Sequence, residues 1–539
     1  MRFILLLLGC LFSVPAFSQS QGLDEKINAK FEPLANLAEN VVLYSISVTD
    51  TIKIPIVVIL LVLGALFFTL AFSFINVRKI GLAIQVIRGK YDGMDVHDPI
   101  NDDKVAVNAV DGDIVQTIKP ENQHGEVNHF QALATAVSGT VGLGNIAGVA
   151  AAIGIGGPGA TFWMIICGLL GMSSKFVECT LGVKYRDIDE NGVVYGGPMY
   201  YLSRGLSEIG KATLGKIFGV LFAVLCVGAS FGGGNAFQSN QATAQIQSFL
   251  KLESGSSGFW IGLILAFLTG IVIIGGIKRI AKVTERIVPI MAILYVGACL
   301  FIIFSKFDLL DEAFGQIFSE AFTPTATVGG LVGVIIIGFK RAAFSNEAGA
   351  GSAAIAHSAV KTKYPASEGI VALLEPFIDT VVICTMTALV IILFNMGDVF
   401  VYGGYTSNVI LKDTGESIGG VGLTSMAFDA ALPGFSKVLT IAIVLFAFST
   451  MISWSYYGLQ AWKYLFGRGK KADLTYKLIY LLFIIVGAAS TLDAVIRFSD
   501  AMILALVFPN MIGLLLLFPK VKEELKTYLD AINVFKTSK

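Results

Sequence analysis

Polar residues and glycines interrupt a long apolar stretch that runs from Gln131 to Cys179. They are Ser138, Gly139, Thr140, Gly142, Gly144 and Asn145. A helix that faced only lipid would gain nothing from these residues, and backbone that leaves helical geometry inside a membrane must be covered by protein or line a wet cavity. The stretch therefore predicts a broken helix whose free N–H and C=O groups are offered to a bound solute.

Gly142 and Gly144 suit such a break, because glycine allows unusual backbone dihedrals and lets a ligand approach the main chain closely. Free N–H groups at the start of a half-helix can hold a carboxylate, and free carbonyls can hold a cation or an ammonium group. Tight helix packing through small residues is the alternative interpretation. The neighbouring Thr140 and Asn145 favour a binding site over packing alone.

Three hydroxyl side chains on one apolar segment, Ser449, Thr450 and Ser453, add candidate oxygen ligands. Ser449 and Ser453 are four residues apart and share one face of a helix. Hard cations are bound by oxygen atoms, and we extend that preference to sodium, with Thr140 and Asn145 as further candidates at the break. The alternative for each hydroxyl is a hydrogen bond to a carbonyl of its own helix.

Larger side chains that could contact a solute are Trp454, which lies one turn beyond Thr450, and the amides Gln238 and Asn240. Thr450 and Trp454 share a helix face, so the hydroxyl can bind a polar end while the indole closes on a small side chain. Trp454 could instead pack in the core or at the membrane interface. Amide side chains inside a membrane also join helices, which is the alternative for Asn240 in particular.

Asp379 is an acid within an apolar segment, four residues after Glu375. A carboxylate inside a membrane span is a functional hypothesis by default, here a sodium ligand or a proton carrier. Glu375 could reach the membrane interface instead. Glu178, Glu347 and Arg341 lie near predicted helix ends, where either a salt bridge that gates a pathway or simple snorkelling would explain them.

The composition identifies an integral membrane protein. Of 539 residues 55% are hydrophobic and 14% are charged, and the mean hydropathy is +0.75. Repeated apolar windows of about 20 residues predict helices rather than an outer-membrane barrel. The formal net charge is zero with scattered basic residues, so nothing predicts nucleic-acid binding. The cysteines and the four histidines show no metal-ligand spacing, so no metal centre of that kind is predicted.

The N-terminal region divides into four predicted parts. Residues 1–18 have the layout of a signal peptide, with lipidation at Cys10 as an alternative, and residues 19–52 would be an exported segment. Residues 53–90 hold a first transmembrane helix followed by a basic amphipathic helix, and residues 91–128 form an acidic cytoplasmic linker.

Ten further spans are predicted, which gives about 11 transmembrane helices. Their ranges are 129–153, 158–183, 215–247, 258–276, 283–305, 325–345, 366–394, 435–461, 474–492 and 497–519. Basic loops then fall on one side and base-poor loops on the other, which predicts a multi-pass protein of the bacterial inner membrane with its N-terminus outside. Residues 520–539 would be a cytoplasmic C-terminal tail.

The ten spans divide into two sets of five, residues 129–305 and 306–519. The first member of each set is rich in glycine, at Ser138–Gly148 and at Thr327–Val334. Paired interruptions at matching positions indicate an inverted-repeat transporter with broken first and sixth core helices and a site near the middle of the membrane.

Several long blocks of this chain resemble the alanine/glycine:cation symporter family. The blocks run from His129 to Trp163, from Gly232 to Gln241, from Lys340 to Ala353, from Glu375 to Val390 and from Phe446 to Gly458. The resemblance implies a leucine-transporter-type core of ten helices with one peripheral helix. Thr161, Ile165 and the wholly apolar stretch Gly329–Lys340 depart from the family pattern, and the exported segment and acidic linker lie outside the resemblance.

The same resemblance implies roles for particular residues. Carbonyls of Ser138 and Val141, with hydroxyls from the eighth core helix, would form a sodium site, and Thr450 with Trp454 would contact substrate. The implied function is sodium-coupled import of a small neutral amino acid, alanine or glycine, by a protein whose other partner is membrane lipid. Proton coupling through Asp379 and a non-transporting sensor are the alternatives. An enzyme is not predicted, because the sequence holds no HExxH pattern and no Ser/His/Asp group.

Overall fold

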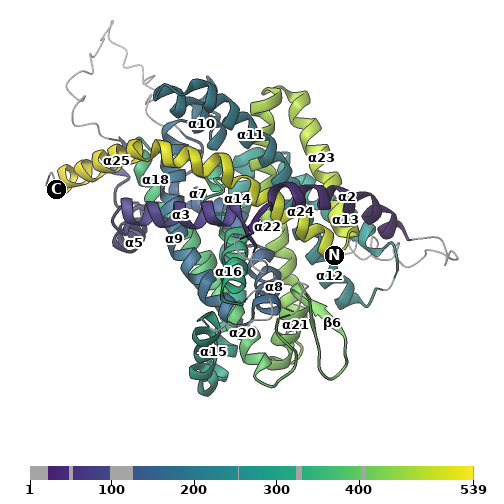
Figure 1. Cartoon of the computed structure of the whole chain (residues 1–539). Coiled ribbons are helices and arrows are strands. Elements are labelled where there is room, and N and C mark those ends of the chain that lie inside the picture. The colour runs from purple at the N-terminus through teal and green to yellow at the C-terminus, as the bar shows by residue number, and fades with distance from the viewer. Residues whose placement is uncertain are drawn as a thin grey trace, which may run out of the picture.

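The chain is almost entirely helical in a computed structural model that describes residues 22–47, 53–96, 125–252, 254–322, 330–403 and 408–537 (Figure 1). The predicted signal peptide and most of the predicted acidic linker lie outside these residues. Three antiparallel ribbons of two short strands accompany the helices: β1 Ser45–Ser47 with β2 Lys53–Pro55, β3 Asp187–Ile188 with β4 Val194–Tyr195, and β5 Asn408–Ile410 with β6 Ser417–Gly419. The prediction of an all-α membrane protein is confirmed.

Helices of different length precede the core in the described chain. They are α2 Leu23–Val42, α3 Ile56–Ala71, α4 Ile75–Arg78, α5 Ile80–Ile87 and α6 Gly93–Val96. Helix α3 corresponds to the predicted first span. Helix α2 was not predicted; its buried side chains recur every three or four residues, and Phe31 meets Phe498 edge to face at 5.3 Å between ring centroids.

The predicted spans correspond to helices of the core. In chain order these are α7 His129–Thr140, η2 Leu143–Asn145 and α8 Ala147–Gly156; α9 Gly159–Lys184; α11 Ala212–Phe231, η3 Gly232–Ala236 and α12 Phe237–Leu250; α13 Ser257–Ile273; α14 Gly276–Ser305; α16 Gly330–Asn346 and α17 Ala353–His357; α18 Pro365–Ala372, α19 Leu374–Pro376, η5 Phe377–Cys384 and α20 Thr385–Asn395; α22 Ser436–Phe466; α23 Lys470–Ala489; α24 Leu492–Ala505 and α25 Val507–Thr537.

Seven helices of the described chain are long and apolar enough to cross a membrane, and α7 with α8 makes an eighth span when the bent pair is counted as one. Helices α3 and α13 are apolar but shorter. The total of 11 spans therefore stays a prediction. The final helix continues to Thr537, through most of the stretch that the sequence analysis assigned to a tail.

Amphipathic helices that the sequence analysis missed connect the spans. Helix α10, Pro198–Glu208, lies at one end of the bundle, and α15, Leu310–Phe322, and α21, Gly420–Ala431, lie at the other end (Figure 1). The short 3-10 turn η4, Phe307–Leu309, precedes α15. These helices are only 11 to 13 residues long, so a search for membrane-length apolar windows does not find them.

The first core helix is interrupted where the glycine-rich run lies. A capping box in which Asn128 and Gln131 bond each other's backbone N–H groups starts α7. The helix ends at Thr140, and α8 leaves the break at an angle of 54° to α7. Two further distortions, the π-helical segments η3 and η5, lie in the third and seventh spans of the core.

The structure describes only part of the predicted interruption of the sixth core helix at Thr327–Val334. Residues 327–329 lie outside the described residues, and from Gly330 the chain is helical as far as Asn346. The described break is the turn between α16 and α17, where Glu347, Gly349 and Gly351 have φ angles of 55°, 91° and 84°. Gly330, the first residue of α16, also has a positive φ, of 62°, so glycines with left-handed dihedrals lie at both ends of α16.

Candidate substrate and cation site

Side chains take up the backbone groups that the break in α7 releases. The N–H group of Gly142 donates to Asn145 Oδ1 at 2.9 Å, and that of Leu143 donates to Gln238 Oε1 at 2.9 Å. All of these residues are buried. Both N–H groups are therefore held by side-chain oxygens, and an anionic group could accept the same hydrogen bonds.

Gly142 is packed so closely that a side chain would not fit. A Cβ atom there would lie 2.4 Å from Thr450 Oγ1 and 3.0 Å from Gln238 Oε1. At Gly144 the nearest atoms to such a Cβ belong to Phe344, at 3.5 Å, which is an ordinary contact. Of these two glycines, only Gly142 is tightly packed, and its close neighbours belong to α22 and α12.

Hydroxyl groups of α22 meet α7 just before the break. Ser138 Oγ donates to the carbonyl oxygen of Ser449 at 2.8 Å, Thr450 Oγ1 donates to the carbonyl oxygen of Ser138 at 3.0 Å, and Ser453 Oγ lies 3.0 Å from Ser138 Oγ. These four residues bring hydroxyl and carbonyl oxygens together in a buried region, which is the ligand chemistry that a hard cation needs.

Two predicted oxygen ligands already make hydrogen bonds to carbonyl oxygens of their own helices. Thr140 Oγ1 lies 3.3 Å from the carbonyl oxygen of Ala136 and 3.4 Å from that of Val137, and Ser449 Oγ donates to Phe446 at 2.9 Å. Val141 caps α7, and its N–H group donates to Val137 at 2.7 Å.

Asp379 lies in η5 and is fully buried next to the break. Its Oδ1 accepts from Asn145 Nδ2 at 2.7 Å, and its Oδ2 accepts from Ser345 Oγ at 2.8 Å and from Thr380 Oγ1 at 2.7 Å. No basic side chain pairs with it anywhere in the described ranges. A carboxyl group held only by neutral donors is suited to take up a passing cation or a proton.

Ser345 and Thr380 were missed by the sequence analysis. Each is close to a residue that the sequence singled out, since Ser345 lies two residues before Glu347 and Thr380 follows Asp379. A π-helical segment widens the turn around Asp379 and Thr380, and such bulges often occur at functional sites.

Gln238 and Trp454 both lie against η3, but they make different contacts. Gln238 Nε2 donates to the carbonyl oxygen of Gly233 at 2.9 Å, which orients its Oε1 toward the break. The Trp454 ring packs on Gly234, where a Cβ atom would be 2.1 Å from Trp454 Cγ. Trp454 Nε1 donates to Glu347 Oε1 at 3.0 Å, so the indole links α22 to the turn after α16.

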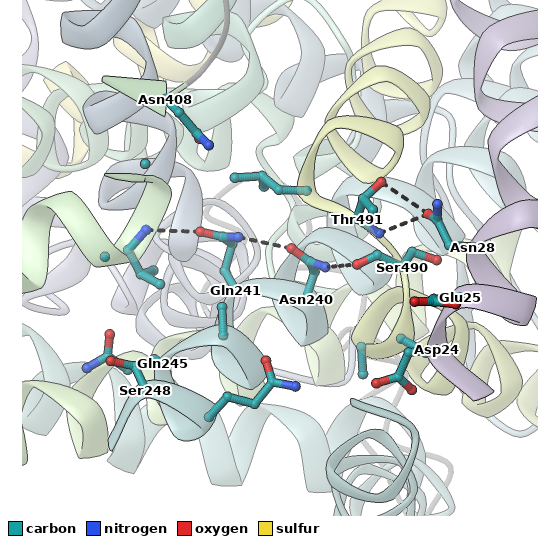
Figure 2. Close-up of a pocket in the computed structure, with 18 of the residues that line it drawn as sticks. Asp24, Glu25, Asn28, Asn240, Gln241, Gln245, Ser248, Asn408, Ser490 and Thr491 are labelled. Atoms are coloured by element: carbon teal, nitrogen blue, oxygen red, sulfur yellow. Dashed lines mark hydrogen bonds between the residues drawn. The ribbon is translucent and has the colours of Figure 1, made fainter. Parts of the chain in front are cut away.

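An open cavity of about 560 Å³ lies farther along α12 (Figure 2). Its polar lining includes Asp24, Glu25, Asn28, Asn240, Gln241, Gln245, Asn408, Ser490 and Thr491. Gln238, Gln241 and Gln245 follow helical spacing on α12, so one row of amides leads from this cavity to the break. Asn240 donates to the carbonyl oxygens of Gly487 and Ser490, which matches its interpretation as a link between helices.

Helix α2 forms one wall of this cavity. Asp24 accepts from the N–H groups of Gly258 and Phe259, both at 3.0 Å, and so caps α13 from another segment. Burial raises the pKa of Asp24 despite these two hydrogen bonds. Asn28 Oδ1 accepts from the Thr491 N–H at 2.9 Å at the start of α24. Helix α2 thereby fixes the positions of two spans beside the cavity.

The family model described as the sodium:alanine symporter family matches residues 104–538, which is most of the chain. The chain belongs to this family. The N-terminal helices α2 to α6 precede the matched region. Membership makes the chain an amino-acid transporter that works by cation symport, and not an enzyme.

Two relatives in this family are named for different amino acids. The "Sodium/alanine symporter AgcS" of Methanococcus maripaludis is 42% identical over 409 residues, which are 76% of this chain and 85% of the relative. The "Probable sodium/glutamine symporter GlnT" of Bacillus subtilis is 35% identical over 404 residues, which are 75% of this chain and 78% of the relative. Among solved structures, a crystal structure of MhsT with L-phenylalanine is 15% identical, with a TM-score of 0.47 over 74% of this chain and 99% of that chain.

Replacing Gly142 by alanine tests the close packing at the break. We expect Gly142→Ala to reduce amino-acid uptake at least tenfold, because its Cβ would displace Thr450 and Gln238 from the break. Gly148→Ala, the matched control, should retain uptake within about twofold, because no atom lies within 4 Å of its new Cβ. Initial rates in proteoliposomes, normalised to folded protein, give the comparison, and equal loss in the two variants would contradict it.

Proposed function

We propose that this chain is a sodium-coupled symporter that imports a small neutral amino acid, alanine or glycine, by alternating access. The observation that carries the proposal is the break in α7, where two backbone N–H groups are held by replaceable amide oxygens. A substrate carboxylate can take over both hydrogen bonds when Asn145 and Gln238 move aside, so no backbone group is left without a partner in the dry core.

The sodium ion would lie beside the break, at the oxygen atoms shared by α7 and α22. The candidates are the carbonyl groups of Ser138 and Val141 and the hydroxyl groups of Thr450 and Ser453. Hydroxyl groups rotate, so Thr450 and Ser453 can turn their lone pairs from a hydrogen bond toward an ion. Asn145 and Asp379 would contribute further oxygen atoms on the η5 side.

The close packing favours a small substrate. Thr450 and Gln238 both lie within contact distance of Gly142, and the Trp454 ring fills the space over Gly234. A substrate bound to the main chain at Gly142 and Gly144 would meet these groups at its α-carbon, which leaves room for a methyl group or a hydrogen but not for a long side chain. The relative AgcS, named a sodium/alanine symporter, agrees with that choice.

Sodium entry supplies sufficient free energy for uphill import. One inward cation gains about 2.3 kcal/mol per 100 mV of membrane potential. A tenfold sodium gradient adds about 1.4 kcal/mol, and together these terms support accumulation of several hundredfold.

Proton coupling through Asp379 is the second candidate. It is favoured by one observation, that this buried carboxyl group has three neutral donors and no basic partner in the part of the chain that the structure describes. A proton could replace a sodium ion on such a group without any other change in the site.

Counterflow of radiolabelled alanine into proteoliposomes is the direct test of the function. We expect exchange and uphill uptake to require sodium and to persist when the proton gradient is collapsed with an uncoupler. Glutamine and phenylalanine should compete poorly with alanine. Uptake that is indifferent to sodium would contradict the proposal.

Ser453→Ala tests the cation site. Loss of one oxygen ligand should raise the sodium concentration for half-maximal uptake about tenfold, equivalent to about 1.4 kcal/mol, with little change at saturating sodium. Ser455→Ala is the matched control, because Ser455 Oγ donates at 2.6 Å to Ile452 on its own helix and makes no contact with α7 that the structure records. Sodium titrations of both variants should diverge; overlapping curves would remove Ser453 from the site.

Asp379→Asn separates the two coupling schemes. With Asp379 as a sodium ligand, the variant should need at least tenfold more sodium, while uptake stays dependent on sodium at every pH. With Asp379 as the proton carrier, the variant should lose uphill uptake and retain alanine exchange. Measuring both exchange and net uptake over a range of sodium concentrations assigns the role.

A further inference from the structure

A group of charged side chains is buried at the end of the bundle where α10 lies, away from the break in α7. The group, here called the buried ionic cluster, consists of His129, Lys175, Glu178, Glu347, His357, Glu368 and Glu375. His129 is 8% exposed and the others are at most 2% exposed. Its members come from the first, second, sixth and seventh core helices, and the proposed substrate and sodium contacts do not use them.

Direct contacts connect most of the cluster. Lys175 Nζ lies 3.0 Å from Glu375 Oε1, and His357 Nδ1 lies 2.5 Å from Glu368 Oε1. His129 Nδ1 contacts the other oxygen of Glu368. His357 Nε2 and Glu375 Oε2 face each other at 3.6 Å, too far for a hydrogen bond, and neither has another partner in the described structure.

The charges of the cluster do not balance without bound protons. It contains four carboxyl groups, one lysine and two imidazoles. If both imidazoles are protonated, three positive charges face four negative ones. A net charge in a buried region costs several kcal/mol, so the neutral cluster holds one further proton on a carboxyl group.

The hydrogen bonds indicate which carboxyl group holds that proton. Glu368 and Glu375 each contact two basic groups, as an ionised carboxylate prefers. Glu347 accepts on both oxygens, from Trp454 Nε1 and from the hydroxyl of Ser352. Each of these three acids therefore has either two basic partners or a hydrogen-bond partner on both oxygens.

Glu178 is the remaining carboxyl group. Its Oε1 accepts from the N–H of Gly349 at 2.8 Å and from Asn510 Nδ2 at 3.0 Å, whereas its Oε2 is buried and has no partner in the described residues. An ionised Glu178 would leave a charged oxygen without a donor. A neutral acid, with Oε1 as the carbonyl oxygen and the proton on Oε2, fits this environment at lower cost.

We infer that Glu178 is a proton-binding group whose proton exchanges with the solution at the α10 end of the bundle, so that transport depends on the pH of that side. The inference rests on the proposed transport function. Under the predicted topology that side is the cytoplasm. The proton is bound and released on the same side, so it is not carried across the membrane with the substrate.

The position of Glu178 explains how transport would expose it. Gly349 belongs to the turn between α16 and α17, and Asn510 belongs to α25, so Glu178 lies where these segments meet α9. When they separate to open a pathway, water reaches the carboxyl group and alkaline pH removes its proton. The ionised group opposes return to the dry arrangement, and turnover slows.

The charged groups around Glu178 support the direction of this pH dependence, in which alkaline pH slows turnover. Lys175 and Cys179 are on the same helix, Glu375 faces Glu178 from α19, and Tyr201 faces it from α10. Glu347, in the turn after α16, lies near Lys175. His357 and Glu368 lie beyond Glu375. Lys175, the only permanent cation of the cluster, is bonded to Glu375 rather than to Glu178. Ionisation of Glu178 would therefore add a negative charge among acids whose basic partners are already engaged.

The test is alanine uptake by the full chain in right-side-out proteoliposomes, with the outer pH fixed and the inner pH set between about 6.5 and 9. We expect the wild-type rate to fall at least fivefold across this range. Glu178→Gln, which keeps the Oε1 acceptor and cannot ionise, should vary less than twofold. Glu178→Asp should keep the pH dependence at a lower rate, and Glu523→Gln, on the exposed part of α25, should follow the wild type.

A second readout is independent of transport. The infrared spectrum of the wild type at neutral pH should contain a C=O band of a protonated carboxylic acid that Glu178→Gln removes. Absence of that band, or an unchanged pH profile in Glu178→Gln, overturns the inference. A proton influx stoichiometric with alanine, followed with a pH-sensitive dye, also overturns it. Failure of alanine uptake at every pH contradicts the proposed function, while the infrared band still tests the proton on Glu178.

Discussion

An unpaired backbone N–H group inside a membrane costs several kcal/mol, and the centre of this structure is organised around that constraint. The break in α7 creates such groups at Gly142 and Leu143. Asn145 and Gln238 satisfy them with side-chain oxygens. Gln238 can reach the break because its own amide nitrogen is held by Gly233 in the π-helical segment η3. The π-helical distortion of the third core span therefore positions the side chain that satisfies the break in the first.

Asn145 joins the two halves of the site. Its oxygen accepts from Gly142 and its nitrogen donates to Asp379, so one amide side chain contacts both the backbone break and the buried acid. A ligand that displaces the oxygen from Gly142 must move the same side chain that holds Asp379. Binding at the break would therefore change the hydrogen bonds of the acid, which is a physical route by which the proposed substrate and cation could favour each other.

The spans were predictable because a bilayer imposes a length and an apolar composition on each of them. The pairing of Ser138 with Thr450 and Ser453 was also accessible, since resemblance and helix spacing brought these residues together before the structure did. The contacts of Trp454 with Glu347 and of Asp379 with Ser345 were not predicted. Each joins segments more than 30 residues apart, and the spacing of residues along one helix carries no information about its neighbour.

Local chemistry also set limits on the prediction. The interruption of the sixth core helix was predicted at Thr327–Val334, which lies partly outside the described residues; the turn after α16, where Gly349 and Gly351 have positive φ, was not predicted. Helix α2 was missed because it lies in a polar segment that contains no apolar window of membrane length. Its role depends on Asp24 and Asn28, which cap helices that begin more than 230 and 460 residues later.

Two kinds of buried acid occur in this protein, and the difference between them follows from their partners. Glu368 and Glu375 are bonded to basic side chains of other helices, so removing a partner would leave an uncompensated charge. These contacts join the first, second, sixth and seventh core helices. Asp379 is held by an amide and two hydroxyl groups. Neutral donors can rotate away without leaving a charge behind, so an arriving cation can take their place. The first arrangement stabilises a rigid unit, and the second leaves a carboxyl group that a cation or a proton could approach without displacing another charge.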